Sequence, residues 1–486
     1  ANRGEIACRV IRACRTLGLP TVTIYSEADA EAVHTWMADE RVCVGPADSA
    51  ESYLRSDRIL QACADLKVTL IHPGYGFLSE NPEFREACDD AGVGFVGPAA
   101  HAMRQMGVKT VARETMLAAG VPVVPGTDKG LRDGTHATEM ANEMGYPVML
   151  KAAAGGGGKG MRLVTEGQDV AAAFEGAQRE ASAYFGDDTV YIEKFIERPR
   201  HVEVQVLADS FGNTVHVFDR ECSVQRRNQK VIEESPAPHL SESTRLKMGE
   251  VAVQAARAVN YVGAGTIEFL VDPDENFYFL EMNTRLQVEH PVTELVTGVD
   301  LVVEMLRVAM GHPLSLNQAQ IQQRGHAVEC RIYAEDPSKN FLPSPGQLTV
   351  YRPPMGPGIR VDDGCVEGGE IPRFYDPMIA KVSAWGPDRQ SAIARMDAAL
   401  AHFEIAGIAH NVPYLRWVMA SAQFQGGRYD TGIVAQLGEY TAQIQDDLQA
   451  KVFAALTAHR QGRTGGKSEG KPHSEWQRAA RNWIVR

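Results

Sequence analysis

The chain has 486 residues, of which 44% are hydrophobic and 23% are charged, and its formal net charge at pH 7 is −13. This length exceeds what one hydrophobic core supports, so several domains of an ordinary globular protein are expected. The acidic balance argues against a nucleic-acid surface, and no apolar run reaches the ~18 residues of a membrane span, so neither is an expected partner. The eight cysteines are scattered without a C-x-x-C pair, which is typical of reduced thiols in a cytosol-like compartment.

The N-terminal part, residues 1 to about 107, alternates helical and strand-like segments as parallel α/β domains do. In chain order we expect a helix at 6–17, a strand at 20–25, a helix at 56–63 and a strand at 68–71. The last strand runs into an HPGYG turn, in which His72 and Tyr75 are interpreted as turn structure. Glu80, slightly further on, is interpreted as the cap of a helix.

The pattern then changes from α/β to antiparallel β. We expect a helix at 109–119 and a punctuated strand at 121–125. A small α/β module should follow from 125 to about 197, and a set of antiparallel strands at 201–283. A turn at 272–276 would join the last two strands into a hairpin. Pairing of these strands would bring Glu268 and Glu281 together across the sheet.

The C-terminal part returns to mixed structure. We expect a helix at 300–310, a β-rich stretch at 327–385 and a helix at 388–402. An amphipathic helix is expected at 443–456. Residues 462–472 are rich in Gly, Lys and Ser and are interpreted as a linker. The chain opens on Ala1 without the first strand of a nucleotide-binding-like domain, so we expect it to be a fragment of a longer polypeptide.

The run EMNTRLQVEH at 281–290 is the most informative stretch. In an extended strand, alternate residues share one face at a spacing of about 7 Å; here these are Glu281, Asn283, Arg285, Gln287 and Glu289. Carboxylate and amide oxygens suit Mg²⁺, and a guanidinium suits a planar oxyanion. A half-solvated sheet face shows the same alternation, so the run alone leaves both interpretations open.

A short apolar strand ends at Lys151 and is followed by the loop GGGGKG at 155–160. Successive glycines let the backbone approach a polyphosphate, and Lys151 and Lys159 add positive charge. The loop is not a Walker A motif, because Gly160 follows Lys159 where Ser or Thr is required. A flexible linker is the alternative, although a linker does not need a strand that ends in lysine.

Two further groups favour a nucleotide and a metal. Residues 193–196, EKFI, offer backbone groups for an adenine edge and Phe195 as an apolar wall, or else form an ordinary core strand. Glu268 and Glu281 would repel each other without a cation, which favours a shared Mg²⁺ over two solvated carboxylates.

These motifs resemble those of the ATP-grasp biotin carboxylases. The resemblance rests on KAAAGGGGKGM, EKFIERPRHVEVQV, RECSVQRRNQKVIEESPAP and EMNTRLQVEHPVTE, together with ANRGEIACRVIRA, HPGYGFLSEN, HAVECRIYAEDP and FLPSPG. It runs in order from residue 1 to about 440, and the RRNQK and EKFI segments are most similar to the carboxylase part of propionyl-CoA-type acyl-CoA carboxylase α subunits.

The resemblance implies an α/β fold that becomes α+β in its C-terminal part. The implied units are a Rossmann-like N-terminal domain at 1–107 and an ATP-grasp domain at 108–323, with its mobile lid at about 124–197. A C-terminal biotin carboxylase domain follows at 324–440, and a connector with the start of a further domain at 441–486.

The resemblance also implies a role for particular residues. ATP would be held by Lys109, Lys151, Gly157, Gly158, Glu193, Lys194, Phe195, Ile196, His201, Gln225 and Asn228. Mg²⁺ or Mn²⁺ would be coordinated by Glu268, Glu281 and Asn283. Bicarbonate would be bound by Lys230, Arg285, Gln287, Val288 and Glu289, with Glu289 as general base, and Arg331 would face the ureido oxygen of biotin. The catalytic set would be Arg285, Glu289, Lys230 and Arg331.

The implied activity is ATP- and bicarbonate-dependent carboxylation of biotin through carboxyphosphate, the first half-reaction of an acyl-CoA carboxylase. The implied partners are bicarbonate, a biotin carboxyl carrier domain and a carboxyltransferase subunit in a larger oligomeric complex, in the cytoplasm or, in a eukaryote, the mitochondrial matrix. Leu246 precedes Lys247 where a biotin acceptor site has methionine, so the chain is expected to act on biotin without carrying it. Asn228 departs from the histidine of many family members, and it cannot carry that residue's charge.

Three alternatives stay open at this point. They are the biotin carboxylase part of a pyruvate carboxylase, another ATP-grasp carboxylate ligase of the carbamoyl-phosphate or peptide type, and a catalytically silent nucleotide-binding scaffold. RLQVEH opposes the second, because those ligases need no bicarbonate pocket with its own base. The presence of Lys230, Glu281, Arg285 and Glu289 opposes the third.

Overall fold

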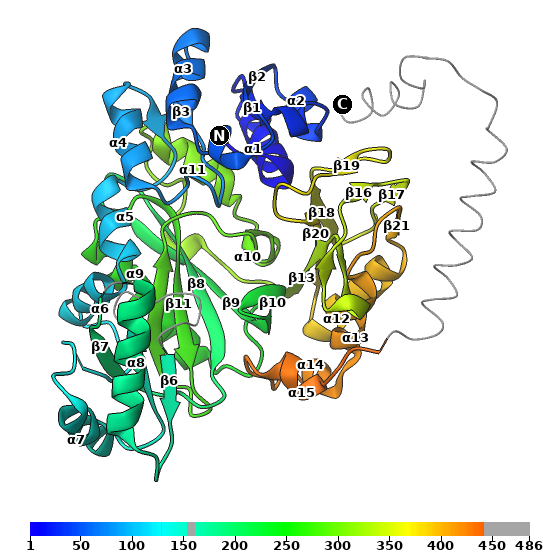
Figure 1. The fold of residues 1–486 in the computed structure, drawn as a ribbon. Helices are drawn as coiled ribbons and strands as arrows, with labels where there is room; N and C mark the ends of the chain where they lie inside the picture. Colours follow the sequence, from blue (N-terminus) through cyan, green and yellow to red (C-terminus); the bar gives the residue numbers. More distant parts are fainter. Residues whose placement is uncertain (128, 153–160, 186, 442–486) are drawn as a thin grey trace.

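The computed structural model describes residues 1–127, 129–152, 161–185 and 187–441. A large antiparallel sheet occupies the centre of the molecule (Figure 1). The N-terminal α/β part lies beyond one end of the sheet, a small three-stranded module lies beside it, and the C-terminal helices and short strands cover its far side.

The N-terminal part contains two pairs of parallel strands, as the alternation of segments predicts. Strand β1 (Val22–Ser26) pairs with β2 (Glu40–Gly45), and β3 (Leu70–Ile71) pairs with β4 (Gly94–Phe95). The helices of this part are α1 (Gly4–Thr16), α2 (Val33–Met37), α3 (Ser56–Leu66), α4 (Pro82–Asp90) and α5 (Ala100–Gly107). Burial of Ile59, Phe84 and Phe95 between them forms a separate small core.

The three-stranded module follows helix α6 (Lys109–Ala118) and has the strand order β6-β5-β7. Its elements are α7 (Gly134–Met144), β5 (Val148–Ala152), β6 (Met161–Val164), α8 (Val170–Phe185) and β7 (Val190–Lys194). The glycine loop, with Gly157 and Gly158, lies between β5 and β6 outside the described residues.

The strand predicted at 121–125 is wrong. Only a single bridge forms there, between Val123 and Phe279. Pro122 and Pro125 lack the backbone N–H that a ladder requires, so no ladder forms, although their carbonyls accept single hydrogen bonds from Phe279 N and Lys194 N.

The central sheet has eight strands in the order β12-β11-β8-β9-β10-β13-β20-β18, and every neighbouring pair is antiparallel. The strands are β8 (Arg200–Ala208), β9 (Thr214–Arg226), β10 (Gln229–Ser235), β11 (Gly263–Val271), β12 (Phe277–Asn283), β13 (His326–Tyr333), β18 (Ile359–Asp363) and β20 (Met378–Gly386). Helices α9 (Glu242–Ala258), α10 (His290–Thr297), α11 (Leu301–Ala309) and α12 (Arg389–Ala401) pack against it. The β10–β13 pairing joins the middle of the chain to its C-terminal part in one continuous sheet.

The predicted hairpin around 272–276 is confirmed, and Glu268 on β11 stands directly opposite Glu281 on β12. The extended strand predicted over the whole run from Glu281 is wrong beyond Asn283. The chain bends at 284–285 and makes a turn at 288–289 before α10 begins at His290. The polar residues of this run are therefore gathered by a turn and not by the alternation of a strand.

The C-terminal part completes the fold with short strands and helices. These are β14 (Glu335–Asp336), β15 (Leu342–Pro343), β16 (Gly346–Gln347), β17 (Val350–Arg352), β19 (Glu370–Ile371), β21 (Glu404–Ala406), α13 (Val412–Ala420), α14 (Ala422–Gly426) and α15 (Ile433–Leu437). The amphipathic helix predicted at 443–456 lies outside the described residues. Among the described helices, none combines the length and the apolar character needed to cross a membrane.

Candidate active site

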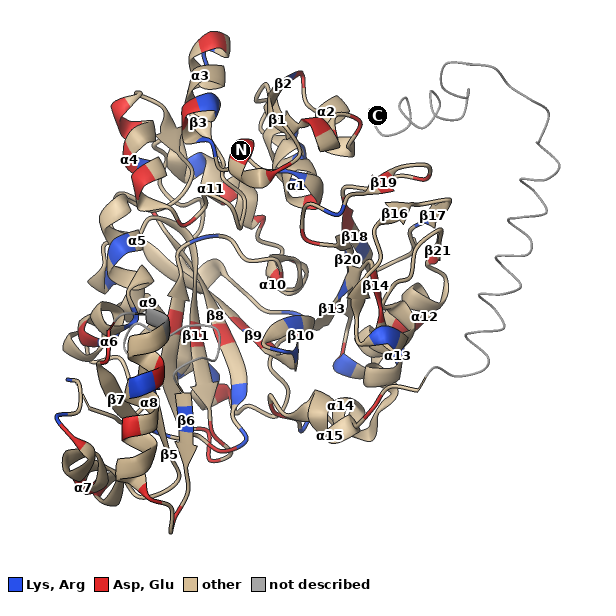
Figure 2. Cartoon of the chain, in the orientation of Figure 1, with Lys and Arg blue, Asp and Glu red and all other residues tan. Residues whose placement is uncertain are grey.

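The site is built around the ammonium of Lys230 on β10. Figure 2 shows acidic and basic positions gathered on the central strands β8–β11. The Lys230 Nζ lies 2.6 Å from Glu203 Oε2, 2.9 Å from Glu268 Oε1 and 2.7 Å from Glu289 Oε1. Three carboxylates from β8, β11 and the turn before α10 thus converge on one cation.

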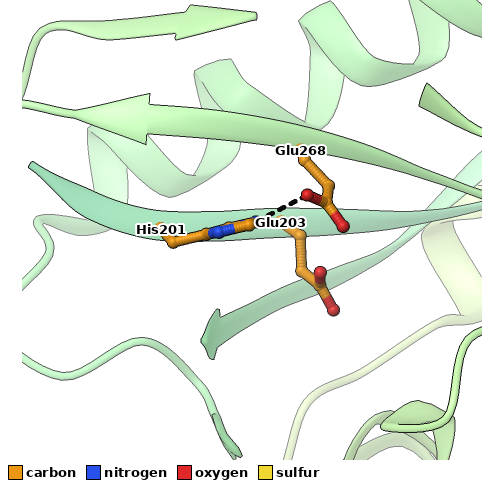
Figure 3. A group of neighbouring side chains, drawn as sticks. All are labelled: His201, Glu203 and Glu268. Carbon is orange, nitrogen blue, oxygen red and sulfur yellow. Dashed lines mark ion pairs between the residues drawn. The ribbon is translucent and has the colours of Figure 1, made fainter. Parts of the chain in front are cut away.

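Three of the neighbouring side chains have the donor set of a metal site. Donor atoms of His201, Glu203 and Glu268 all lie within 4.8 Å of one another, and the His201 ring points toward Glu268 with Glu203 beside it (Figure 3). The Lys230 ammonium, however, already contacts both glutamates. Burial alone would lower the pKa of Lys230, but the surrounding carboxylates raise it well above its ordinary value. Lys230 therefore supplies the positive charge that a metal would supply.

Glu289 is held between two cations. Its Oε1 accepts from Lys230, and its Oε2 accepts from Arg331 Nη2 at 3.0 Å. Burial alone would raise the pKa of Glu289, but Lys230, Arg331 and Arg220 hold it well below its ordinary value. Arg331 on β13 also donates from Nε to Glu233 at 2.6 Å. Three of the predicted catalytic residues thus form a single ionic chain from β10 to β13.

The two carboxylates of the β11–β12 hairpin have unequal surroundings. Glu268 Oε1 accepts from Asn283 Nδ2 at 2.8 Å and from Gln287 Nε2 at 2.7 Å. Burial alone would raise its pKa, but Lys230 and His201 hold it well below its ordinary value. Within the described part of the chain, the Glu281 side chain has neither a hydrogen bond nor an ion pair. Burial and the nearby Glu268 raise the pKa of Glu281.

Arg285 is fixed on both of its sides. Its Nη2 donates to Asn283 Oδ1 at 3.0 Å, and its Nε donates to Glu80 Oε2 at 2.9 Å. Glu80 Oε1 also accepts from the Thr284 backbone N–H at 2.9 Å. The prediction that Glu80 caps a helix is wrong, because Asn81 is the residue whose side chain caps α4. Glu80 instead connects the N-terminal part to the turn that carries Arg285.

The residue between Gln287 and Glu289 is held by the C-terminal part. The Val288 carbonyl accepts from Lys381 Nζ on β20 at 2.8 Å, and Lys381 is fully buried. The Lys381 Nζ also lies 3.3 Å from Glu5 Oε1 on α1. The turn is therefore attached both to the C-terminal and to the N-terminal part of the molecule.

The predicted nucleotide residues fall into two groups. His201 Nε2 lies 2.7 Å from Glu268 Oε2, and its Nδ1 lies 2.8 Å from Gln225 Nε2, so these two join the central cluster. Burial would lower the pKa of His201, but Glu268 raises it. Asn228 stands in the β9–β10 turn with φ +65° and has no contact to this cluster among the described residues.

The second group belongs to the three-stranded module. Lys151 Nζ lies 2.5 Å from Glu193 Oε2, so these two form an ion pair across β5 and β7. Lys194 Nζ donates to the carbonyls of Gly145 and Tyr146 at 2.9 and 3.0 Å. Two more predicted residues follow β7 as irregular backbone, namely Phe195 and Ile196. Lys109 begins α6, where its charge lowers the pKa of Glu281 against the effect of burial.

Three buried charged residues of the site were missed by sequence reasoning, namely Glu203, Arg220 and Glu233. Each lies in a strand otherwise rich in buried apolar residues. A fully buried charge is rare unless it is paired, so charged residues inside strands such as RHVEVQVLA are the signal that could have found them.

Three protein-family models match the chain. They are the biotin carboxylase N-terminal domain over residues 1–103, the carbamoyl-phosphate synthase L chain ATP binding domain over 109–317, and the biotin carboxylase C-terminal domain over 329–436. The biotin carboxylase of a Nostoc species is 51% identical over 439 residues, which are 90% of this chain and 98% of that protein. The propionyl-CoA carboxylase alpha chain of Ruegeria pomeroyi is 48% identical over an alignment that covers 100% of this chain and 75% of that protein.

A solved structure of similar sequence has the same fold. It is the biotin carboxylase domain dimer of the Hydrogenobacter thermophilus 2-oxoglutarate carboxylase, in complex with MgADP, ADP and bicarbonate. It matches with a TM-score of 0.82 and 44% identity, over 90% of this chain and 98% of that one. The chain therefore belongs to the biotin carboxylase family of ATP-grasp enzymes. Its activity is that of a biotin carboxylase, an ATP-dependent ligase.

Proposed function

We propose that this chain uses ATP to activate bicarbonate as carboxyphosphate and transfers the carboxyl group to biotin on a separate carrier domain, as the first half-reaction of an acyl-CoA carboxylase. The observation that carries the proposal is the ionic chain in which Glu289 lies between Lys230 and Arg331. It connects a cation for bicarbonate, a carboxylate for its proton and a cation for the ureido oxygen within one buried cluster.

Each substrate has its own set of residues. Bicarbonate is bound by Lys230, Arg285, Gln287, the Val288 backbone and Glu289. ATP is bound by Lys109, Lys151, Glu193, Lys194, Phe195, Ile196, His201, Gln225 and Asn228, with Gly157 and Gly158 of the loop. Support comes from the Hydrogenobacter relative, whose structure contains MgADP and bicarbonate.

Mg²⁺ or Mn²⁺ would be held by Glu268, Glu281 and Asn283. Two observations fit a cation there: the Glu281 carboxylate has no hydrogen bond or ion pair among the described residues, and its pKa is raised by burial and by Glu268. A divalent ion held by these residues would supply positive charge for the phosphates of ATP.

Glu289 is a weak base while both cations contact it, because they stabilise its carboxylate. Bicarbonate that engages Lys230, and a ureido oxygen that engages Arg331, each withdraw part of this stabilisation. The pKa of Glu289 then rises toward the range in which it accepts a proton efficiently. Substrate binding itself thus prepares the base.

The reaction proceeds in two stages. Glu289 takes the proton of bicarbonate, and the resulting oxyanion attacks the γ-phosphorus as the bond to ADP breaks, which gives carboxyphosphate. Carboxyphosphate breaks into CO₂ and phosphate, and the phosphate takes the proton from biotin N1′. Arg331 stabilises the negative charge on the ureido oxygen while N1′ attacks CO₂. The module at about 124–197 acts as a lid that excludes water from carboxyphosphate.

The purified chain tests this scheme directly. We expect ATP cleavage, measured as phosphate release with MgCl₂, to require bicarbonate and to increase when free biotin is added. ATP cleavage that is indifferent to omission of either one would contradict the proposal.

The final acceptor is proposed to be an acyl-CoA of the propionyl type. The alignment with the Ruegeria propionyl-CoA carboxylase alpha chain supports this, because it covers the whole chain. The Hydrogenobacter relative belongs to a 2-oxoglutarate carboxylase, so the shared fold alone does not select an acceptor. The test is incorporation of labelled bicarbonate by the natural holoenzyme, with propionyl-CoA and pyruvate offered separately. Labelling of pyruvate alone would favour the pyruvate carboxylase alternative.

A further inference from the structure

Arg220 on β9 lies beneath the site and is among the largest fully buried side chains of the described residues. Its guanidinium donates from all three nitrogens, and each acceptor is a side-chain oxygen of another element. The acceptors are Glu203 Oε1 at 2.5 Å, Gln205 Oε1 at 2.8 Å, Thr293 Oγ1 at 3.0 Å, Thr266 Oγ1 at 3.1 Å and Gln287 Oε1 at 2.7 Å. Since a guanidinium has five N–H donors, its hydrogen-bonding capacity is fully used.

We propose that Arg220 is a positioning residue that fixes the bicarbonate pocket through Gln287 and Glu203. The inference rests on the proposed function, because it takes Gln287 and Lys230 as bicarbonate ligands. Arg220 itself contacts neither ATP nor bicarbonate in this scheme. It acts by determining how two of the contacting side chains are presented.

The first consequence concerns the direction of the Gln287 amide. An amide can present its oxygen or its NH₂ group, and the two look alike in shape. Arg220 can only donate, so the Gln287 oxygen must face it. The NH₂ group consequently faces Glu268, to which Nε2 donates at 2.7 Å. One of the two amide protons is left for an anion in the pocket.

The second consequence concerns Lys230. The two oxygens of Glu203 are divided between cations, with Oε1 on Arg220 and Oε2 on Lys230. Without the guanidinium, Glu203 would carry its full negative charge toward Lys230 alone. The ammonium would then be drawn away from Glu289 and from the pocket. Arg220 therefore keeps Lys230 available to bind an anion.

The hydrogen bonds of Arg220 restrain the elements that surround it. The acceptors come from strands β8 and β11, from the turn after β12 and from helix α10, so Arg220 fixes four elements relative to one another. Loss of one partner in a buried polar network leaves the others unsatisfied, which transmits the change to the site.

The test is the variant Arg220→Lys, analysed with Gln287→Ala as a double-mutant cycle. A lysine has three donors on one nitrogen and cannot reach all of these acceptors. We expect the KM for bicarbonate to rise about tenfold or more while the KM for ATP changes less than about twofold. In the Gln287→Ala background, Arg220→Lys should raise the bicarbonate KM much less, because its main route of action is already gone.

The matched control is Arg9→Lys. Arg9 is also buried and ion-paired, to Glu294 at 2.9 Å and Asp300 at 2.6 Å, but it contacts no predicted site residue. We expect this variant to leave the KM values for both substrates unchanged. If Arg220→Lys fails to fold, Thr266→Val, which removes only one acceptor, should raise the bicarbonate KM in the same direction by a smaller factor.

The outcomes separate the two levels of the proposal. If Gln287→Ala raises the bicarbonate KM but the effects of the two variants simply multiply, the positioning of Gln287 by Arg220 is refuted and the bicarbonate site stands. If Gln287→Ala leaves the bicarbonate KM unchanged, the proposed bicarbonate site fails, and the role of Arg220 fails with it. Equal increases in the KM for ATP and for bicarbonate would indicate that Arg220 is merely structural.

Discussion

The central sheet and the three-stranded module both carry predicted site residues, but they bury their charges to different degrees. On the sheet, Glu203 and Arg220 are fully buried, and Lys230 is 13% exposed at its side chain. On the module, the Lys151 side chain of the Lys151–Glu193 pair is 29% exposed and the Glu193 side chain is 10% exposed. Buried charges interact strongly and depend on every partner, whereas exposed pairs are screened by water.

This difference matches a division of labour. Proton transfer and charge stabilisation need fixed groups in a dry environment, which the sheet offers. Nucleotide binding and closure need groups that can exchange partners, which a partly exposed ion pair allows. The comparison can be tested by substitutions on each side.

The largest expected effect is that of Glu289→Gln on the sheet. An amide cannot take the proton of bicarbonate, so kcat for bicarbonate-dependent ATP cleavage should fall by about 10²–10⁴. The affinity for ATP, measured by calorimetry, should stay nearly the same, because no predicted nucleotide residue contacts Glu289. Turnover within tenfold of the parent protein would rule out Glu289 as the base.

A matched control for this substitution is Glu329→Gln on β13. Glu329 is also fully buried, burial raises its pKa well above the ordinary value, and its Oε2 accepts a hydrogen bond from Ser383 Oγ at 2.7 Å. Its replacement by a neutral amide should leave kcat within about twofold of the parent value.

The second effect concerns stability on the same sheet. Glu234 contacts His326 at 2.6 Å and Arg389 at 2.7 and 2.9 Å. Burial alone would raise its pKa, but these partners lower it from 4.5 to about 2. The difference corresponds to about 3 kcal/mol of folding free energy. Glu234→Gln should lower the free energy of unfolding by about that amount in chemical denaturation at pH 7.

The sign of the pH dependence follows from the lowered pKa. The contribution of Glu234 is fully present above pH 4.5 and is lost as pH falls toward 2. Stability of the variant should therefore vary less between these pH values than stability of the parent protein. Glu404→Gln is the control, since the Glu404 side chain is 43% exposed in its pair with Arg352 and should change stability by less than about 1 kcal/mol.

The third prediction concerns the edge of the sheet, where Glu80 orients the Arg285 side chain. Glu80→Ala should raise the KM for bicarbonate about tenfold, because loss of this charge-assisted hydrogen bond leaves the guanidinium held only from the side of Asn283 and Leu286. Steady-state kinetics at varied bicarbonate would measure this. Glu83→Ala on α4 is the control, since Glu83 is 70% exposed and contacts only Arg104 among the described residues. An unchanged bicarbonate KM in Glu80→Ala would show that Arg285 needs no such support.

The smallest effect is expected on the module. Glu193→Gln removes the negative partner of Lys151 from a partly exposed pair, so stability should change by less than about 1 kcal/mol. The 193–196 segment is proposed to bind ATP through its backbone groups, so affinity for ATP should rise by up to about fivefold, because Lys151 no longer has to leave a carboxylate. A loss of ATP affinity beyond tenfold would mean that the Glu193 side chain itself contacts the nucleotide, and the contrast between sheet and module would disappear.

Much of the local structure was accessible from the sequence. The α/β start, the hairpin around 272–276 and the pairing of Glu268 with Glu281 follow from periodicity and turn chemistry. The residue order within the motifs was specific enough to identify the biotin carboxylase family. Local patterns suffice there because neighbouring strands and family motifs are both short-range features of the chain.

The prediction that failed at 284–289 shows where short-range patterns stop being sufficient. Alternation of polar residues suggested a strand, but the chain bends there because Arg285 is bound by Glu80, about 200 residues away in sequence, and Val288 is bound by Lys381. The bend turns Gln287 toward Arg220 and Glu289 toward Lys230. A prediction from neighbouring residues cannot identify these partners, because they are distant in sequence.

The sequence by itself determined the family, the activity and which residue types are available for it. The tertiary structure decided which carboxylate meets which cation, and thereby which groups are charged. That decision cannot be read from the chain, because the pKa of a buried group is set by burial and by charges that distant strands bring within hydrogen-bonding distance. Glu289 is the clearest case: its low pKa depends on Lys230, Arg331 and Arg220, which come from three different strands of the sheet.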